Sequence, residues 1–411
     1  MPRSSHVRYS IVGLVTAINL LCYADRTVIA AAAPLIQKDL GFSHFQMGVI
    51  FGIFSVAYAL GQTPWGAVAD RFGARRLVAG AILAWSAFTT LTGLARGYVS
   101  MLVVRFSFGT LEAPLSPSTA AAFARWTPLT ERATSFSVFL SGGRLGAAIT
   151  PPLAVYLLMR FGWRATFMML GFLGIPAALV WLAWFCDDPG AHPRIASGEK
   201  ELLRSVAAST AARPRISWPA LLRSSRLWCL LSVSFTITFL WQFYITWFPT
   251  YLIERRGLPL KEASFYAGLP FLLGIAGLWV GGVGTDFLTR RLDARRARWV
   301  VGVAGQIMAG ALMLAGMLLP RPHIAALVMA SAAFSSDMIL GAIWTSAVEI
   351  GGAAAGAVAG LSNCASNLAA FASPFLMGLV LEMHGSWNTL LFAAVAGAFL
   401  GAGLWTRVQA R

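Results

Sequence analysis

The sequence predicts an all-α membrane protein with twelve transmembrane helices in two six-helix halves. Of its 411 residues, 57% are hydrophobic and only 12% are charged, whereas a soluble domain carries about 25% charged residues. The positive mean hydropathy of +0.69 is concentrated in long apolar runs, and a bilayer crossing needs about 20 such residues. One long polar stretch lies between the sixth and the seventh run, which predicts the division into halves.

Each predicted span is a mainly apolar run bounded by charged or turn-forming residues. The run 323–348 is unusual because it contains Asp337, and the boundary near 355 leaves a very short loop. In chain order, the spans are 9–33, 44–69, 77–96, 98–121, 133–158, 165–186, 226–252, 262–288, 299–319, 323–348, 355–381 and 387–406. The polar stretch 187–225 contains four prolines, and we expect a cytoplasmic linker there between an N-terminal half, 1–186, and a C-terminal half, 226–411.

The net charge of +16 does not indicate nucleic-acid binding, because the arginines form short clusters between apolar runs and do not line a wettable face. Most basic residues fall in alternate loops, together with the N-terminus. The positive-inside rule therefore predicts that both termini are cytoplasmic. The four cysteines include no C-x-x-C pair, and the five histidines are scattered, so we expect no metal site and no cofactor. No nucleotide-binding loop or catalytic triad is visible, which argues against an enzyme and against ATP-driven transport.

The loop after the second span carries the motif Gly66-x-x-x-Asp70-Arg71-x-Gly73-x-Arg75-Arg76, with six specified positions among eleven. A weaker copy, Gly282-x-x-x-Asp286 followed by Arg290-Arg291, follows the eighth span, as expected for two related halves. Glycine permits close helix approach, the aspartate can accept from a helix N-terminus, and the arginines suit an anionic leaflet. We expect a gating latch made of Gly66, Asp70, Arg71, Gly73, Arg75 and Arg76.

This motif resembles the loop signature of the major facilitator superfamily. Four further stretches, together with His192-Pro193-Arg194, resemble its anion:cation symporter family: Tyr23-Ala-Asp25-Arg26, the Ala57–Gly66 stretch with Tyr58, Arg105-x6-Glu112-Ala-Pro114 and Thr246-Trp-Phe-Pro249-Thr-Tyr251-Leu. The resemblance implies the major facilitator fold and import of small organic anions with protons. The family's substrates are typically sugar acids such as galactonate, glucarate or hexuronates.

Six ionisable residues lie in the interior of the predicted spans, away from the span ends: Asp25, Arg26, Arg105, Glu112, Arg144 and Asp337. Each costs about 2.5–3.5 kcal/mol near a helix centre, so they must be paired or face a wet cavity. Their depths predict two cross-helix pairs, Asp25 with Arg105 and Glu112 with Arg144. These pairs could be static salt bridges, or they could open during transport.

In the functional interpretation, Asp25 and Glu112 carry protons, and the resemblance supports both assignments. Arg144, helped by Arg105 or Arg26, holds the substrate carboxylate through a bidentate contact. The remaining candidates for substrate contact are Tyr23 and Tyr58, which match family positions, then Trp241, Gln242 and Tyr244 on the seventh span, and Asn363 and Asn367 on the eleventh. Packing tyrosines, interfacial tryptophans and interhelical hydrogen bonds are the structural alternatives for these residues.

The sequence thus predicts a secondary active transporter of the inner membrane that imports a sugar acid or related carboxylate with protons by alternating access. A transporter of an aromatic or other carboxylate, and a membrane sensor that binds an anion without moving it, are the alternatives. A proton-driven drug exporter fits less well, since three membrane arginines do not suit a cationic substrate. The expected partners are the organic anion, protons and the lipid bilayer, and the expected functional form is a monomer. Which anion is carried, the proton stoichiometry, the direction of transport and the role of Asp337 stay open.

Overall fold

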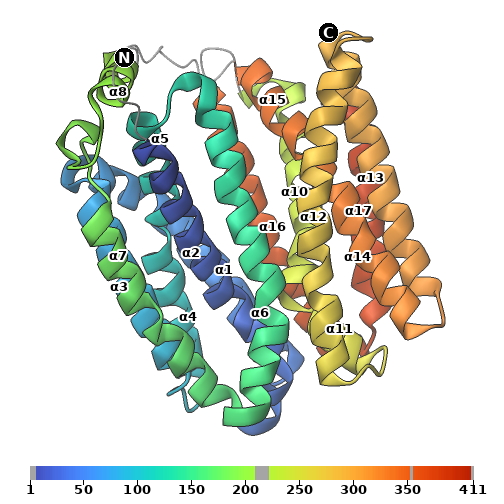
Figure 1. The fold of residues 1–411 in the computed structure, drawn as a ribbon. Helices are drawn as coiled ribbons and strands as arrows, with labels where there is room; N and C mark the ends of the chain where they lie inside the picture. The colour runs from blue at the N-terminus through green and yellow to red at the C-terminus, as the bar shows by residue number, and fades with distance from the viewer. Residues whose placement is uncertain (1–5, 209–221, 352–354, 409–411) are drawn as a thin grey trace. The chain divides into compact units, whose positions relative to one another are not determined.

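A computed structural model describes residues 6–208, 222–351 and 355–408, and in these ranges the regular structure is entirely helical (Figure 1). The first part of the chain forms α1 (Val7–Leu40), α2 (His44–Phe72), α3 (Ala74–Thr92), α4 (Tyr98–Glu112), α5 (Leu115–Trp126), α6 (Leu129–Phe172) and α7 (Gly174–Trp184). The polar stretch contains the short η1 (Pro189–Ala191) and α8 (Ser197–Ala208).

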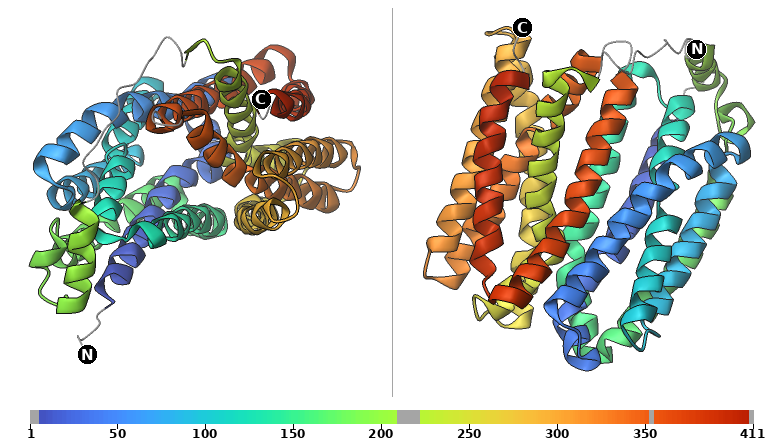
Figure 2. Two further views of the ribbon diagram at one scale, coloured as in Figure 1. Left: turned by 90° about the horizontal axis from the view of Figure 1, so that it is seen from above. Right: turned by 180° about the vertical axis from the view of Figure 1, so that it is seen from behind.

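The described residues of the second part form helices of 7 to 30 residues. They are α10 (Ser225–Thr246), α11 (Phe248–Glu254), α12 (Leu260–Thr289), α13 (Ala294–Leu318), α14 (Pro322–Met338), α15 (Leu340–Gly351), α16 (Ala355–His384) and α17 (Trp387–Val408). The views in Figure 2 show these helices running side by side, and α14 packs on both α12 and α13.

The predicted spans correspond to these helices, with three of them broken in the middle. Span 98–121 is divided between α4 and α5 next to Pro114, span 226–252 at Trp247 just before Pro249, and span 323–348 at Ile339. Prolines remove a helical hydrogen bond and end or kink a helix. Two further spans form one continuous run up to α7 that reverses at Gly162, whose φ of 74° suits glycine.

Nine segments of the described residues are long and apolar enough to cross a membrane. One of them, Thr134–Trp184, contains the reversal at Gly162 and therefore covers two predicted spans. The two predicted spans outside the nine are α3, which begins with Arg75 and Arg76, and α4, which ends after 15 residues. The two arginines lower the mean hydropathy of α3, and α4 is too short by itself to cross a membrane. Both helices nevertheless lie where the sequence predicts a crossing.

The chain forms two compact units. Unit 1 contains the described residues of 1–28, 53–147 and 157–213, and unit 2 those of 29–52, 148–156 and 214–411. Unit 1 has a core of buried tryptophans and phenylalanines, in which Trp181 stacks on Phe185 with ring centres 4.1 Å apart. In unit 2, α10 packs on α16 and α17, and Phe51 lies edge-on to Trp247.

The polar stretch between the halves holds a helix that the sequence analysis does not predict. Glu199 of α8 is 4% exposed, and its carboxylate accepts from the backbone N–H groups of Val7 and Arg8 at 3.2 and 3.1 Å. The Arg8 guanidinium also donates to Glu199 and to Glu131. An acidic side chain at a helix N-terminus is stabilising, so α8 caps the start of α1.

Candidate functional site

The centre of unit 1 contains an ion pair between Arg26 on α1 and Glu112 at the end of α4. The Glu112 side chain is fully buried, and that of Arg26 is 17% exposed. Oppositely charged side chains buried together stabilise one another only when their geometry is good. The last residue of α4 therefore carries an acid whose charge is balanced from a neighbouring helix.

Three aromatic rings surround the Arg26 guanidinium, and we call them the Arg26 cage: Tyr23, Phe54 and Tyr58. The guanidinium carbon lies 4.8, 4.7 and 4.8 Å from their respective ring centres, within the range of a cation–π attraction. Tyr23 and Arg26 share one face of α1, and Phe54 and Tyr58 share one face of α2, because residues three or four apart are neighbours on a helix. The Tyr58 hydroxyl is within hydrogen-bond distance, 2.7 Å, of the Ser116 hydroxyl.

A second arginine, Arg105 on α4, lies beside the cage. Its side chain is buried, with 3% of its surface exposed, and its guanidinium carbon is 5.2 Å from the Phe54 ring centre and 4.9 Å from that of Phe108. Within the described part of the chain, Arg105 forms no ion pair, and its Nε has no hydrogen-bond partner. A buried cation of this kind retains donors for an anionic group.

Asp25 completes this group of charges. It is 1% exposed, and neither carboxylate oxygen accepts a hydrogen bond from any described residue. Trp85 is its neighbour, and the charges of Glu112 and Arg105 act on it. The predicted proximity of Asp25 and Arg105 is therefore present as an electrostatic interaction, without a direct ion pair.

The predicted pairing of Glu112 with Arg144 is wrong, because the acid pairs with Arg26 instead. Arg26 directly follows Asp25 on α1, and its long side chain reaches Glu112 at the end of α4. Arg144 is half-buried on α6. The preceding Gly143 packs so closely on α1 that a Cβ there would lie 2.7 Å from the Tyr23 ring.

The candidate residues on α10 and α16 lie in unit 2. Trp241, Gln242 and Tyr244 are buried, and the Tyr244 hydroxyl donates to the Met329 carbonyl at 2.5 Å. That bond gives Tyr244 a structural role. Trp241 lies next to Gly274, where a Cβ would also meet the Asp337 carboxylate, so Asp337 and Trp241 share one buried neighbourhood. This is where the structure places the acid that the sequence analysis leaves unexplained.

Asn363 and Asn367 are half-buried on α16, one turn apart. The Asn367 amide donates to the backbone carbonyl of Asn363 at 2.9 Å, so the bond stays within the helix. The hydrogen bond that the structure gives Asn367 is therefore not the interhelical bond that the sequence analysis considers as an alternative.

The gating loop is attached to the end of α7. Gly73 has a φ of 81°, and the Arg75 backbone N–H donates to Asp187 at 3.1 Å. The Arg75 guanidinium donates to the Leu182 carbonyl, while Arg76 is exposed. The side chains of Gly66, Asp70 and Arg71 lie outside the described residues.

Two further features carry no signal that sequence reasoning recognised. Phe54 of the Arg26 cage is an ordinary residue of an apolar span, although its spacing of four from Tyr58 could have suggested it. Glu349 near the end of α15 pairs with Arg226, Arg295 and Arg298. Burial alone would raise the pKa of Glu349, but the hydrogen bond from Arg295 and the charge of Arg298 outweigh it and hold that pKa below its usual value. Among the described residues, no group of three His, Cys, Asp or Glu could hold a metal ion.

Comparison with known proteins covers nearly the whole chain. The sequence pattern of the Major Facilitator Superfamily matches residues 15–374. The chain is 32% identical to a probable sulfoacetate transporter of Cupriavidus necator, over 98% of this chain and 94% of the relative. It is 31% identical to a probable galactarate/D-glucarate transporter of Bacillus subtilis (96% and 90% covered) and 30% identical to a hexuronate transporter of the same organism (94% and 89%).

Solved structures show the same fold. A bacterial homologue of the human lysosomal transporter Spinster, in an inward-facing and unoccupied conformation, matches with a TM-score of 0.74 and 19% identity, covering 99% of this chain and 95% of that one. The occupied form of that homologue matches with a TM-score of 0.72.

Proposed function

Because this chain belongs to the major facilitator superfamily, we propose that it imports a small organic anion, a sugar acid or related carboxylate, together with protons by alternating access. In this proposal, an N-terminal half (1–186) and a C-terminal half (226–411), joined by a cytoplasmic linker, open in turn to either side of the inner membrane. The chain is a multi-pass membrane protein of transporter fold and not an enzyme. No cofactor is needed beyond the coupling proton.

The observation that carries the proposal is the buried charge group of unit 1. Arg105 keeps hydrogen-bond donors without an acidic partner, next to an ion pair and a carboxylate with no hydrogen bond. Four charges in a membrane interior are costly, and charged residues kept there despite that cost usually mark a substrate or ion pathway. An anionic substrate bound at Arg105 would supply the missing acceptor.

Proton coupling follows from the same arrangement. When the substrate anion takes part of the positive charge of the arginines, Asp25 and Glu112 lose some of the attraction that keeps them ionised. Proton binding and substrate binding then favour one another by the same free energy in both directions. Asp25 and Glu112 are the proposed proton sites, and Arg105, Arg26 and Arg144 are the proposed substrate contacts.

The remaining predicted contacts complete the proposal. Tyr23 and Tyr58 hold the Arg26 guanidinium and offer hydroxyls to a polyol chain. In unit 2, Trp241, Gln242, Asn363 and Asn367 are proposed to line the pathway, while the bond to Met329 makes Tyr244 a weaker candidate. We propose that the loop with Asp70, Arg75 and its neighbours gates the pathway, that both termini are cytoplasmic and that the monomer is the functional unit.

The test measures lumenal pH in proteoliposomes loaded with a pH-sensitive dye. The panel contains sulfoacetate, galactarate, glucuronate, benzoate and acetate. Sulfoacetate and galactarate are dianions, galactarate and glucuronate are sugar acids, and benzoate and acetate are an aromatic and a simple carboxylate. We expect acidification with one class of compound, lost in Glu112→Gln and retained in Glu262→Gln. The latter makes the same chemical change at a half-exposed surface acid.

Other outcomes distinguish the alternatives. A compound that raises thermal stability without changing lumenal pH or entering the vesicles would indicate a sensor. Uptake of radiolabelled anion at an unchanged lumenal pH would exclude protons as the coupling ion. Concentrative uptake by Glu112→Gln would remove Glu112 from the proton pathway.

A further inference from the structure

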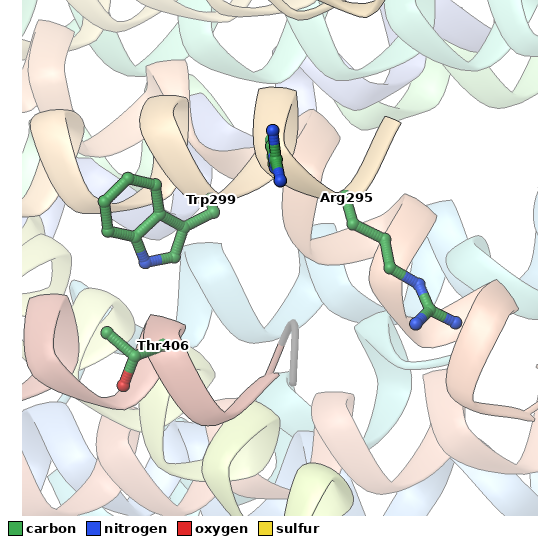
Figure 3. Close-up of a pocket in the computed structure, with 4 residues that line it drawn as sticks. Arg295, Trp299 and Thr406 are labelled. Carbon is green, nitrogen blue, oxygen red and sulfur yellow. The ribbon is translucent and has the colours of Figure 1, made fainter. Parts of the chain in front are cut away.

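One end of unit 2 carries a basic pocket. It has a volume of about 320 Å³ and is lined by Arg295, Arg296 and Trp299 of α13 and by Thr406 of α17. Figure 3 shows Arg295 and Trp299 projecting from one helix and Thr406 from another. This pocket adjoins the loops that the charge distribution predicts to be cytoplasmic.

The two arginines have donors left for a ligand. Arg295 uses its Nε to bind Glu349 at 2.7 Å, and Arg296 uses its Nε to bind Asp293 at 3.2 Å. A guanidinium has five N–H donors, so the terminal nitrogens of both side chains remain for an anion. Arg296 is largely exposed, with 77% of its side chain accessible. The nearest acids therefore orient the arginines without using up their donors.

Next to the arginines, along the line where α13 and α17 pack together, the exposed side chains are apolar. Trp299 and Phe399 are 39% and 40% exposed, and a Cβ at Gly310 would lie 3.2 Å from the Phe399 ring, so the helices meet there. Phe399, Gly403 and Thr406 share one face of α17 by their spacing. A Cβ at Gly403 would meet nothing within 4 Å. The glycine thus leaves a shallow open seam between the pocket and Phe399.

We propose that this pocket binds the phosphate of an anionic phospholipid from the cytoplasmic leaflet, with one acyl chain lying along the seam over Gly403. Arginine forks match phosphate oxygens, and basic pockets between transmembrane helices on the cytoplasmic side suit anionic headgroups. Trp299 lies one turn from Arg295 on α13 and lines the same pocket, which suits an indole that contacts both headgroup and hydrocarbon. A soluble anion would use the arginines but not the apolar seam.

The test counts bound lipid by native mass spectrometry of the full-length protein in detergent, titrated with phosphatidylglycerol or phosphatidylcholine. An arginine at a membrane surface contributes about a five-fold gain in affinity for anionic lipid. We therefore expect Arg296→Gln to bind phosphatidylglycerol about five-fold more weakly, and the double variant Arg295→Gln/Arg296→Gln to lose about 30-fold. The matched control is Arg290→Gln/Arg291→Gln, which removes two exposed arginines of the preceding turn that do not line the pocket.

The controls distinguish binding of anionic lipid at this pocket from general attraction of anionic lipid to the basic surface. The proposal is supported if the control pair binds like wild type, if phosphatidylcholine binds weakly and if Gly403→Leu loses affinity by filling the seam. Equal losses in the two double variants, or equal binding of both lipids, would overturn it in favour of nonspecific surface charge. Displacement of the lipid by an equal concentration of inorganic phosphate would assign the pocket to a free anion. Arg295 also contacts Glu349, so the double variant could lose lipid because its fold is weakened. Arg296→Gln keeps that contact, and a thermal stability equal to wild type shows that its loss of lipid is measured on folded protein.

Discussion

Replacing Glu112 by glutamine tests whether the Arg26–Glu112 pair holds unit 1 together. The acid is fully buried, so the change leaves the Arg26 cation without its counter-charge. Removing one partner of a buried pair costs about 3–5 kcal/mol. The three rings around Arg26 stabilise the cation in the variant as well, by about 0.5–2 kcal/mol each. We therefore expect a loss near the lower limit, about 3 kcal/mol in the free energy of unfolding.

A double-mutant cycle isolates the pair from other effects of each substitution. The variants are Glu112→Gln, Arg26→Gln and the combination, and the assay is denaturant titration in mixed micelles. If the ion pair is real, the double variant is less destabilised than the sum of the single variants by about 1–3 kcal/mol. Additive losses would refute the reasoning, since independent sites show no coupling energy. Full stability of Glu112→Gln alone would refute it as well.

Three further predictions concern packing and the charge network around Glu349. Gly143→Val drives a side chain into Tyr23 and should cost about 1–3 kcal/mol, read from the thermal midpoint, whereas Gly360→Val at an open position should not. Gly73→Ala forces a side chain at a φ of 81° against Asp187, so we expect about 1 kcal/mol or more of destabilisation. The lowered pKa of Glu349 stabilises the fold above about pH 4.3, the pKa of an unfolded glutamate, and this stability is lost as the pH falls through the lower folded pKa. In Glu349→Gln, the acid limb of a stability–pH profile should become flatter, and an unchanged profile would exclude this group.

The membrane spans could be predicted because hydropathy and loop charge determine them directly. An apolar run of about 20 residues has no stable alternative to crossing the bilayer. The breaks inside spans were not predicted, since hydropathy does not register a turn between α14 and α15 at Ile339. The helix α8 was missed because the sequence analysis considered only local patterns in the polar stretch. Its stability depends on Glu199 capping α1, a tertiary contact that no local pattern encodes.

The charged part of the site could also be predicted, because an ionisable residue inside an apolar span stands out. Asp25, Arg26, Arg105 and Glu112 lie close together in unit 1, whereas their depths predicted Asp25 beside Arg105 and Glu112 beside Arg144. Their exact partners could not be predicted, since an arginine side chain spans more than one helical turn and its direction depends on packing. Phe54 shows the same limit, as its role comes only from the position of the Arg26 guanidinium.

The two arginines of unit 1 have different surroundings, and the difference argues for different roles. Arg26 is held by an ion pair and by three rings, so a substrate anion that displaced Glu112 would still meet a positioned cation. Arg105 lies against the rings of Phe54 and Phe108, and within the described residues its charge has no direct acidic partner. Under the proposed function, an arriving anion would therefore displace no acidic partner at Arg105, and the Arg26–Glu112 pair would open afterwards. In this proposed order, the substrate would bind before Glu112 is released to take a proton. Substrate and proton transport would then be coupled, and an empty carrier would not leak protons.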